Sequence, residues 1–149
     1  MSGRSQRATV SQTFLRPTTA NVTKAGSVLV VDDNQELRSL IAHFLRELGY
    51  PIIEADNGEQ ALKRATGARI QVLITDLVMP RMNGYELADR LIVRFPSLEV
   101  LYTSGHARDE VAQTRKLSAR EAFLQKPFGL AELGKKLSEM IASGAPGNS

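Results

Sequence analysis

Three carboxylates, one hydroxyl and one ammonium group stand at the ends of short apolar runs in this sequence. The runs have the length and composition of buried strands, and the polar residues that end or follow them are Asp32, Asp33, Asp76, Ser104 and Lys126. If the strands are parallel, their carboxyl ends meet at one edge of a sheet, where open α/β sheets bind ligands. We therefore expect these five side chains to form one site.

The three aspartates point to a metal ion. Carboxylates packed together repel one another and raise one another's pKa unless a cation joins them. The ligands are hard oxygens, and neither cysteine nor histidine belongs to the set, so Mg²⁺ with several bound waters is the expected ion. An Asp that follows a strand can also simply cap a helix, and for Asp33 beside Asn34 that alternative stays open.

Together with a metal, Lys126 and Ser104 suit phosphoryl transfer onto Asp76. The carboxylate would attack phosphorus and become an acyl phosphate. The metal, the ammonium and the hydroxyl would stabilise negative charge on the equatorial oxygens. An ionised carboxylate carries no proton to remove, so this chemistry needs no general base and fits a set without histidine.

Alternating strand and helix patterns would position these residues. Apolar runs predict five strands, over residues 27–31, 51–55, 72–76, 98–103 and 121–125. Periodic apolar positions predict five helices, over residues 34–48, 58–66, 85–95, 107–118 and 130–141. This alternation predicts an α/β fold, with a parallel sheet, helices on both faces and right-handed crossovers.

The predicted helices differ in how much apolar surface they offer. The stripe of helix 34–48 consists of Leu37, Leu40, Ile41, Phe44, Leu45 and Leu48. Helix 85–95 would pack through Leu87, Ala88, Leu91 and Ile92. Residues 107–118 offer little beyond Val111 and Ala112, so we expect the loosest helix there.

Composition excludes several kinds of protein. The chain of 149 residues suits one domain, contains no cysteine and has no apolar run near the ~20 residues of a membrane helix. The formal net charge is +3, but residues 1–26 hold four basic residues and no acid, and the remainder has 15 basic against 16 acidic residues. A general nucleic-acid-binding surface on the folded part is therefore not expected.

The two ends of the chain differ from the middle. Residues 1–26 are rich in Ser, Thr and Arg without sustained periodicity, which predicts a disordered basic leader. This leader lacks the apolar core of a secretory signal, although it has some transit-peptide character. We expect one domain over residues 27–142, a flexible tail over 143–149 and a cytoplasmic location.

Four segments together resemble a known family. They are Val-Asp-Asp at 31–33, Thr-Asp-Leu-Val-Met-Pro-Arg-Met-Asn-Gly at 75–84, Thr-Ser-Gly at 103–105 and Phe-Leu-Gln-Lys-Pro-Phe at 123–128. This set resembles the receiver domain of two-component response regulators, over about residues 27–142. The resemblance implies a flavodoxin-like (βα)5 sandwich with the parallel strand order 2-1-3-4-5.

The resemblance also implies a role for each site residue. Asp76 looks like the phospho-acceptor, and Asp33, Asp76 and the backbone carbonyl of Val78 look like direct Mg²⁺ ligands. Asp32 would act mainly through bound water. Lys126 looks like the phosphate-binding lysine, in a bond to Pro127 that is cis in the family.

The remaining roles concern switching and the lifetime of the phosphoryl group. Ser104 looks like the switch hydroxyl. Phe123 is either an aromatic that moves inward when that hydroxyl is drawn to the phosphate, or plain core packing. The family's dephosphorylation rates depend on the positions of Val78 and His106. Because Val78 cannot orient an attacking water, a fairly long-lived phosphoryl group is expected.

As a receiver, the chain would catalyse its own phosphorylation and dephosphorylation without being a dedicated turnover enzyme. The implied donor is a sensor histidine kinase or a histidine phosphotransfer protein, and the downstream protein is unknown. Residues 101–106 and 123–128 look most like receivers attached to hybrid kinases, so a phosphorelay intermediate is an alternative.

Other classes of protein fit the residues less well. A phosphohydrolase of the haloacid dehalogenase type would need a second Asp where Val78 stands. An inert protein-binding module would not need the intact set of Asp33, Asp76, Ser104 and Lys126. DNA binding through four dispersed charges of the leader would be weak and salt-sensitive.

Overall fold

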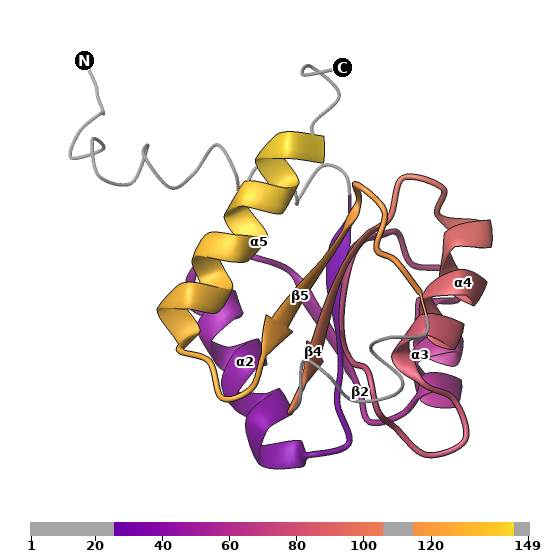
Figure 1. The fold of residues 1–149 in the computed structure, drawn as a ribbon, viewed down its shortest axis with the longest axis horizontal. Helices are drawn as coiled ribbons and strands as arrows, with labels where there is room; N and C mark the ends of the chain where they lie inside the picture. The colour runs from indigo at the N-terminus through magenta and orange to yellow at the C-terminus, as the bar shows by residue number, and fades with distance from the viewer. Residues whose placement is uncertain (1–25, 106–114, 145–149) are drawn as a thin grey trace.

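The computed structural model of this protein describes residues 26–105 and 115–144. Its centre is a parallel sheet with the strand order β2-β1-β3-β4-β5 (Figure 1). The strands are β1 (Ser27–Val31), β2 (Ile52–Ala55), β3 (Ile70–Asp76), β4 (Glu99–Ser104) and β5 (Glu121–Gln125). The predicted flavodoxin-like order 2-1-3-4-5 is confirmed, and every predicted strand is present with ends shifted by at most two residues.

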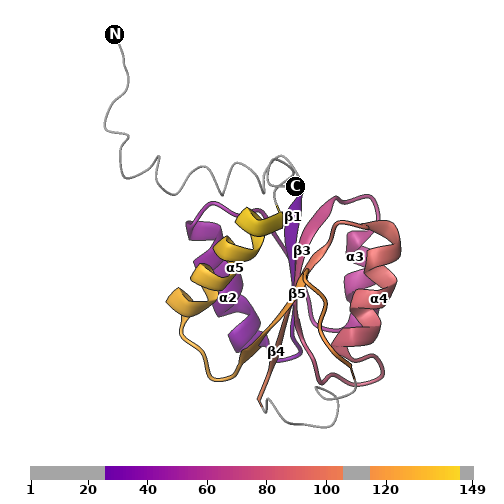
Figure 2. The same ribbon diagram turned by 45° about the horizontal axis from the view of Figure 1, so that its top comes forward.

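Helices cover both faces of this sheet. The described helices are α2 (Gln35–Glu47), α3 (Gly58–Ala65), α4 (Gly84–Arg94) and α5 (Leu130–Gly144). Figure 2 shows the sheet nearly edge-on, with α2 and α5 on one side and α3 and α4 on the other. The molecule is therefore a three-layer sandwich, as the alternating pattern predicted.

Asparagine side chains begin three of these helices. The side chains of Asn34, Asn57 and Asn83 each accept a hydrogen bond from the backbone N–H three residues later. At α4 the Glu86 carboxylate also accepts a hydrogen bond from the backbone N–H of Asn83, which completes a capping box. Asn34, rather than Asp33, therefore caps α2, and Asp33 is left for the site.

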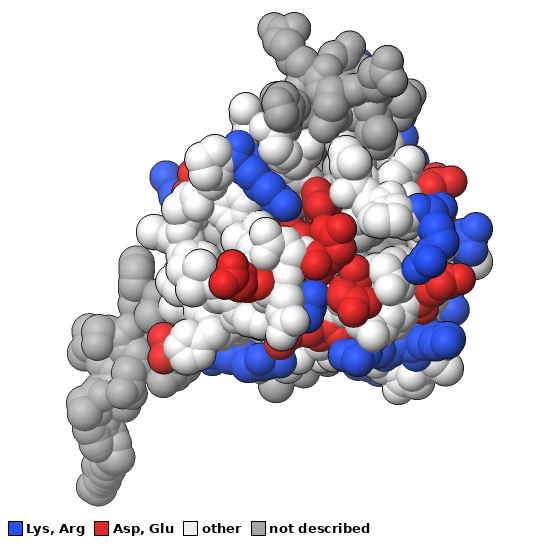
Figure 3. Space-filling model, turned by 90° about the horizontal axis from the view of Figure 1, so that it is seen from below, with Lys and Arg blue, Asp and Glu red and all other residues white. Residues whose placement is uncertain are grey.

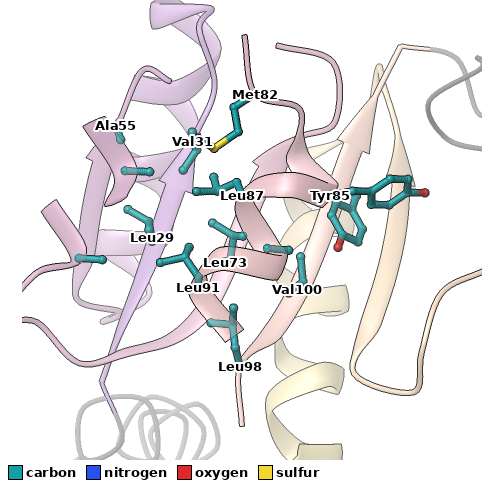
Figure 4. Packing of buried hydrophobic residues seen from close by; sticks show 14 of the residues in the cluster. Leu29, Val31, Ala55, Leu73, Met82, Tyr85, Leu87, Leu91, Leu98 and Val100 are labelled. Carbon is teal, nitrogen blue, oxygen red and sulfur yellow. The ribbon is translucent and has the colours of Figure 1, made fainter. Parts of the chain in front are cut away.

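Two apolar layers hold the sandwich together. Between the sheet and α3/α4 lie Leu29, Val31, Leu73, Leu87 and Leu91, with others, as Figure 4 shows. Between the sheet and α2/α5 lie Val28, Val30, Ile74, Leu133 and Leu137, with others. Because β1, β3 and β4 are buried on both faces, their middle residues are apolar without alternation. Full burial of one such Leu or Val contributes roughly 1.5–3 kcal/mol.

Some predictions about the helices are wrong in detail. Leu40 and Ile92 were assigned to packed faces, but they are 51% and 43% exposed, because each lies at the margin of its stripe. Residues 107–114 of the predicted helix 107–118 lie outside the described residues. Residues 115–118 are not helical, because Arg115 and Leu117 turn toward the core on the α3/α4 side.

The predictions for the chain ends also concern residues that the structure mostly does not describe. Residues 1–25 of the predicted leader and residues 145–149 of the predicted tail fall outside the described ranges. Among the helices within those ranges, none combines the length and the apolar character that crossing a membrane requires.

Candidate functional site

The carboxyl ends of the strands bring all five predicted site residues to one edge of the sheet. Asp32 and Asp33 follow β1, Asp76 ends β3, Ser104 ends β4 and Lys126 follows β5. Figure 3 looks onto this edge and shows acidic side chains gathered in its middle. The predicted convergence of distant segments is therefore present in the fold.

The three aspartates form a compact set of oxygen ligands. One carboxylate oxygen from each of Asp32, Asp33 and Asp76 lies within 4.8 Å of the others. Asp32 and Asp76 are buried and Asp33 is exposed, so the cluster opens to solvent on one side. A hard divalent cation that keeps several waters fits such a donor set, because all three ligands are carboxylate oxygens.

Lys126 lies against the buried part of this cluster. Its Nζ donates a hydrogen bond to Asp32 Oδ2 at 3.0 Å and lies 3.7 Å from Asp76 Oδ2. The backbone N–H of Lys126 donates to the carbonyl of Ser104 at 2.7 Å, and the Lys126–Pro127 peptide bond is cis. The ammonium therefore lies against the carboxylates of both Asp32 and Asp76.

The electrostatic environment of Asp76 makes its carboxylate basic. Burial raises the pKa of Asp76 to about 6, the ammonium of Lys126 opposes this rise, and the charges of Asp32 and Asp33 add to it. The carboxylate also accepts a hydrogen bond from the backbone of Val78, which lowers the pKa. A metal ion beside the three carboxylates would also lower the pKa, and so favour the ionised form of Asp76.

The loop after Asp76 is held by backbone contacts. The N–H of Leu77 donates to the carbonyl of Thr103, and the N–H of Gly84 donates to the carbonyl of Leu77, both at 2.8 Å. A Cβ on Gly84 would lie 2.8 Å from the carbonyl oxygen of Asp76. The close approach of the backbone, and not a left-handed conformation, therefore accounts for a glycine at position 84.

The left-handed backbone conformation in this loop belongs to another residue. Arg81 has φ 68°, which is uncommon for a residue with a side chain. Sequence reasoning missed this position, because arginine gives no signal for such a conformation.

Val78, in the same loop, is 50% exposed, so water can reach this position.

Ser104 and Phe123 lie on neighbouring strands. Ser104 is buried and pairs with Gln125 in the β4–β5 ladder, while the half-buried Phe123 pairs with Tyr102. Residues two apart in a strand share a face, so Ser104 and Phe123 lie on the same side of the sheet. His106, the other position expected to influence dephosphorylation, lies outside the described residues.

An apolar cavity adjoins the site, and sequence reasoning did not identify it. Its volume is about 420 Å³, and its lining consists of Leu37, Gly105, Lys126, Pro127 and Phe128. The lining comes from three places in the chain, so only the fold brings it together. The cavity lies next to the residue whose ammonium contacts Asp76.

A comparison with models of protein families matches a single family over most of the described residues. The family model described as the response regulator receiver domain matches residues 28–138. This range contains all the strands except Ser27, the whole acidic cluster and Lys126.

Two curated relatives come from Brucella abortus (strain 2308). The sensor kinase CckA is 32% identical over 119 residues, which are 78% of this chain and only 13% of that protein. The response regulator receiver protein CpdR is 30% identical over 114 residues, 76% of this chain and 95% of that protein. The chain thus spans a small part of one relative and nearly all of the other.

Solved structures have the same fold. The receiver domain of the hybrid histidine kinase CckA has a TM-score of 0.67 and 29% identity, covering 78% of this chain and 99% of that one. The chemotaxis protein CheY4 of Vibrio cholerae has a TM-score of 0.69 and 32% identity, covering 77% and 98%.

Proposed function

This chain belongs to the response regulator receiver domain family, and from that premise we propose that Asp76 accepts a phosphoryl group from a phosphohistidine donor. Receiver domains act in two-component signalling by phosphorylation on an aspartate. The observation that carries the assignment to Asp76 is its position, 3.7 Å from Lys126 and clustered with two further carboxylates. Within the described residues Asp76 is the member of the cluster that ends the central strand β3.

The proposed reaction moves one phosphoryl group between two side chains. A carboxylate oxygen of Asp76 attacks phosphorus, the bond from phosphorus to the donor imidazole nitrogen breaks, and an acyl phosphate forms. The electron pair stays with the imidazole, which regains its neutral form by taking a proton. Lys126 and the hydroxyl of Ser104 contact the transferred oxygens and stabilise their charge.

Receiver domains bind Mg²⁺ at an acidic pocket, and the proposal includes a magnesium site in this chain. Asp33, Asp76 and the backbone carbonyl of Val78 would hold the ion directly, and Asp32 through water. When bound, the ion supplies positive charge that offsets the negative charge of the phosphoryl oxygens. Asp32 also holds Lys126 in place, since it accepts a hydrogen bond from the ammonium at 3.0 Å.

The proposed output is a change of a protein-interaction face. As the hydroxyl of Ser104 is drawn to the phosphoryl group, the half-buried ring of Phe123 moves inward. The two residues lie on the same side of neighbouring strands, which supports this coupling. The change is a shift between two arrangements of one surface, driven by a local charge.

We also propose that the donor approaches Asp76 over exposed apolar side chains near the site. Receiver domains interact with histidine kinases or phosphotransfer proteins, and we propose that such a protein places its histidine beside the cavity at Lys126. Leu40 on α2 and Val78 in the acceptor loop are exposed large apolar residues, at 51% and 50%. Leu37 of the same helix lines the cavity.

A relay role is a second candidate for the same chemistry. The similarity to part of the sensor kinase CckA favours it, because relay receivers occur within hybrid kinases, whereas the match to nearly all of CpdR favours a separate effector. Incubation of the phosphorylated chain with a histidine phosphotransfer protein distinguishes them. A relay loses its phosphoryl group rapidly to that protein, and an effector keeps it.

The proposed function is tested by incubating the full chain with acetyl phosphate and Mg²⁺ and recording its intact mass. Wild type should gain one phosphoryl group, and Asp76→Asn none. Asp56→Asn is the matched control, because Asp56 follows β2 at the same edge of the sheet but binds Asn57 outside the cluster. Equal phosphorylation of the Asp76→Asn variant, or none of wild type, would overturn the proposal.

A further inference from the structure

A group of five side chains ties α4, β4 and the start of β5 together. Arg115 Nη1 donates to Asp89 Oδ1 on α4 at 2.8 Å, and Nη2 donates to the hydroxyl of Tyr102 and to Glu121 Oε2, both at 2.8 Å. The guanidinium carbon lies 4.4 Å from the centroid of the Tyr85 ring. We call Arg115, Asp89, Tyr85, Tyr102 and Glu121 the Arg115 cluster.

Tyr102 is the fully buried member of this cluster. Its hydroxyl donates to Glu121 Oε2 at 2.5 Å, and its ring meets that of Tyr85 edge to face, with centroids 4.8 Å apart. Burial and Glu121 both raise the pKa of Tyr102, so the hydroxyl stays protonated as a donor. Figure 4 shows Tyr85 at the end of the apolar cluster farthest from Ala55.

Glu121 completes the cluster from β5. Burial alone would raise the pKa of Glu121, but hydrogen bonds from Tyr102 and Ser118 and the charge of Arg115 hold it below its usual value. The backbone N–H of Ser118 donates to Glu121 Oε1 at 2.9 Å. The carboxylate therefore stays ionised and holds both Arg115 and Tyr102.

The strand register places this cluster beside the residues proposed to switch. Tyr102 pairs with Phe123, and both contact the same apolar layer. Tyr102 and Ser104 lie two apart on β4, and Glu121 and Phe123 lie two apart on β5, so all four face α4. A ring at position 123 that moves inward toward Ser104 therefore changes its packing against its strand partner Tyr102.

We infer that the Arg115 cluster restrains the switch: it holds Tyr102 in place, and so opposes the inward movement of Phe123 that phosphorylation of Asp76 drives. The inference rests on the proposed function, because it concerns the response to a phosphoryl group at that site. Displacement of Tyr102 breaks its hydrogen bonds to both Arg115 and Glu121, which are costly to lose in a buried place. The cluster thereby determines how strongly a phosphoryl group on Asp76 changes the surface formed by α4, β4 and β5.

Not every contact in the Arg115 cluster is strong, so its contacts can break and form again. Arg115 Nε is buried and has no hydrogen-bond partner among the described residues. Asp89 is 64% exposed, so its ion pair with Arg115 is weakened by water.

The test is the affinity of the full chain for beryllofluoride, a phosphoryl analogue, in the presence of Mg²⁺, measured by titration calorimetry. A ligand that binds the switched arrangement binds more tightly when that arrangement is more populated. Tyr102→Phe removes the hydroxyl and keeps the ring, and Arg115→Gln removes the charge. Both variants should bind beryllofluoride about three- to tenfold more tightly than wild type.

Arg120→Gln is the matched control. Arg120 also joins β4 to the segment before β5, but it binds Glu99 outside the cluster. Its affinity for beryllofluoride should remain within about twofold of wild type. If Tyr102→Phe fails to fold, Asp89→Asn takes its place, because it changes an exposed partner of the same guanidinium.

The outcomes separate the two proposals. If wild type binds beryllofluoride and the folded variants bind it equally or more weakly, the restraint is disproved and the proposed function stands. If wild type does not bind it, or Asp76→Asn binds it as well as wild type does, the proposed function falls and takes the restraint with it.

Discussion

The ammonium of Lys126 donates a 3.0 Å hydrogen bond to the carboxylate of Asp32, which lies 94 residues earlier in the chain. This contact joins the ends of β1 and β5, with the central strand β3 between them in sequence. It also competes with a metal ion for Asp32, because both are cations. We therefore expect the ammonium to affect both phosphorylation of Asp76 and binding of the metal ion, and the two effects can be measured separately.

Lys126→Met should slow phosphorylation by a small donor by about 10–100-fold, because one positive group that stabilises the transferred oxygens is lost. The same variant should bind Mg²⁺ more tightly, since the carboxylates lose a competing cation. Rates come from intact mass against time, and Mg²⁺ affinity from calorimetry. Lys135→Met, on the exposed side of α5, is the control and should change neither quantity. Weaker Mg²⁺ binding in Lys126→Met would contradict this account.

Asp76→Asn should stabilise the metal-free protein at neutral pH. The pKa of Asp76 is raised in the fold, mainly by burial, from 3.8 to about 6, so the folded state holds this proton more tightly than the unfolded state. Its favourable contribution is therefore complete below the ordinary pKa and is lost as pH rises through the raised one. At pH 7.5 the variant should gain about 1–3 kcal/mol in the free energy of unfolding.

Urea unfolding at two pH values checks this sign. The gain from Asp76→Asn should be small near pH 4, and Mg²⁺ should reduce it at pH 7.5 because the ion binds the folded wild type. A variant that is less stable than metal-free wild type at pH 7.5 would show that the carboxylate is not held at a raised pKa.

Gly84→Ala should destabilise the acceptor loop. A Cβ at this position would lie 2.8 Å from the carbonyl oxygen of Asp76 and 3.0 Å from Cα of Leu77, and backbone atoms cannot move aside easily. We expect a loss of about 1–3 kcal/mol, measured by chemical unfolding. Gly129→Ala, where a Cβ would have no neighbour within 4 Å, should be nearly neutral. Equal effects of the two substitutions would argue against the close approach.

Val78→Asn should shorten the lifetime of the phosphoryl group. Val78 is half exposed beside Asp76 but has no polar group with which to orient an attacking water. An amide at this position can do so, and the half-life of the phosphorylated chain should fall several-fold. The measurement is loss of the phosphoryl mass after the donor is removed. A wild-type half-life of only seconds would disprove the predicted slow decay.

The strand order and the acidic site could be predicted because short-range patterns determine them. The run that leads to Asp76 is apolar without alternation from Val72 to Ile74, as in a strand covered on both faces, and the Asn residues at 34, 57 and 83 mark helix starts. Parallel topology then brings the strand ends together, whatever the loops do.

The features that were missed depend on contacts between residues of ordinary type far apart in sequence. Arg115 meets Asp89 across 26 residues, and Tyr102 meets Glu121 across 19, and neither pair gives a local signal. The same contacts explain why residues 115–118 are not helical. The exposure of Leu40 and Ile92 was missed because an apolar stripe shows which face of a helix is buried. It does not show how much of that face the rest of the protein covers.

The most direct measurement locates the phosphoryl group on one side chain. After phosphorylation with acetyl phosphate and Mg²⁺, borohydride reduces an aspartyl phosphate to homoserine, and fragment mass spectrometry identifies the position. The account predicts homoserine at position 76, and none when Mg²⁺ is removed by a chelator. Homoserine at position 32, 33 or 56 instead, or a magnesium-independent yield at position 76, would contradict it.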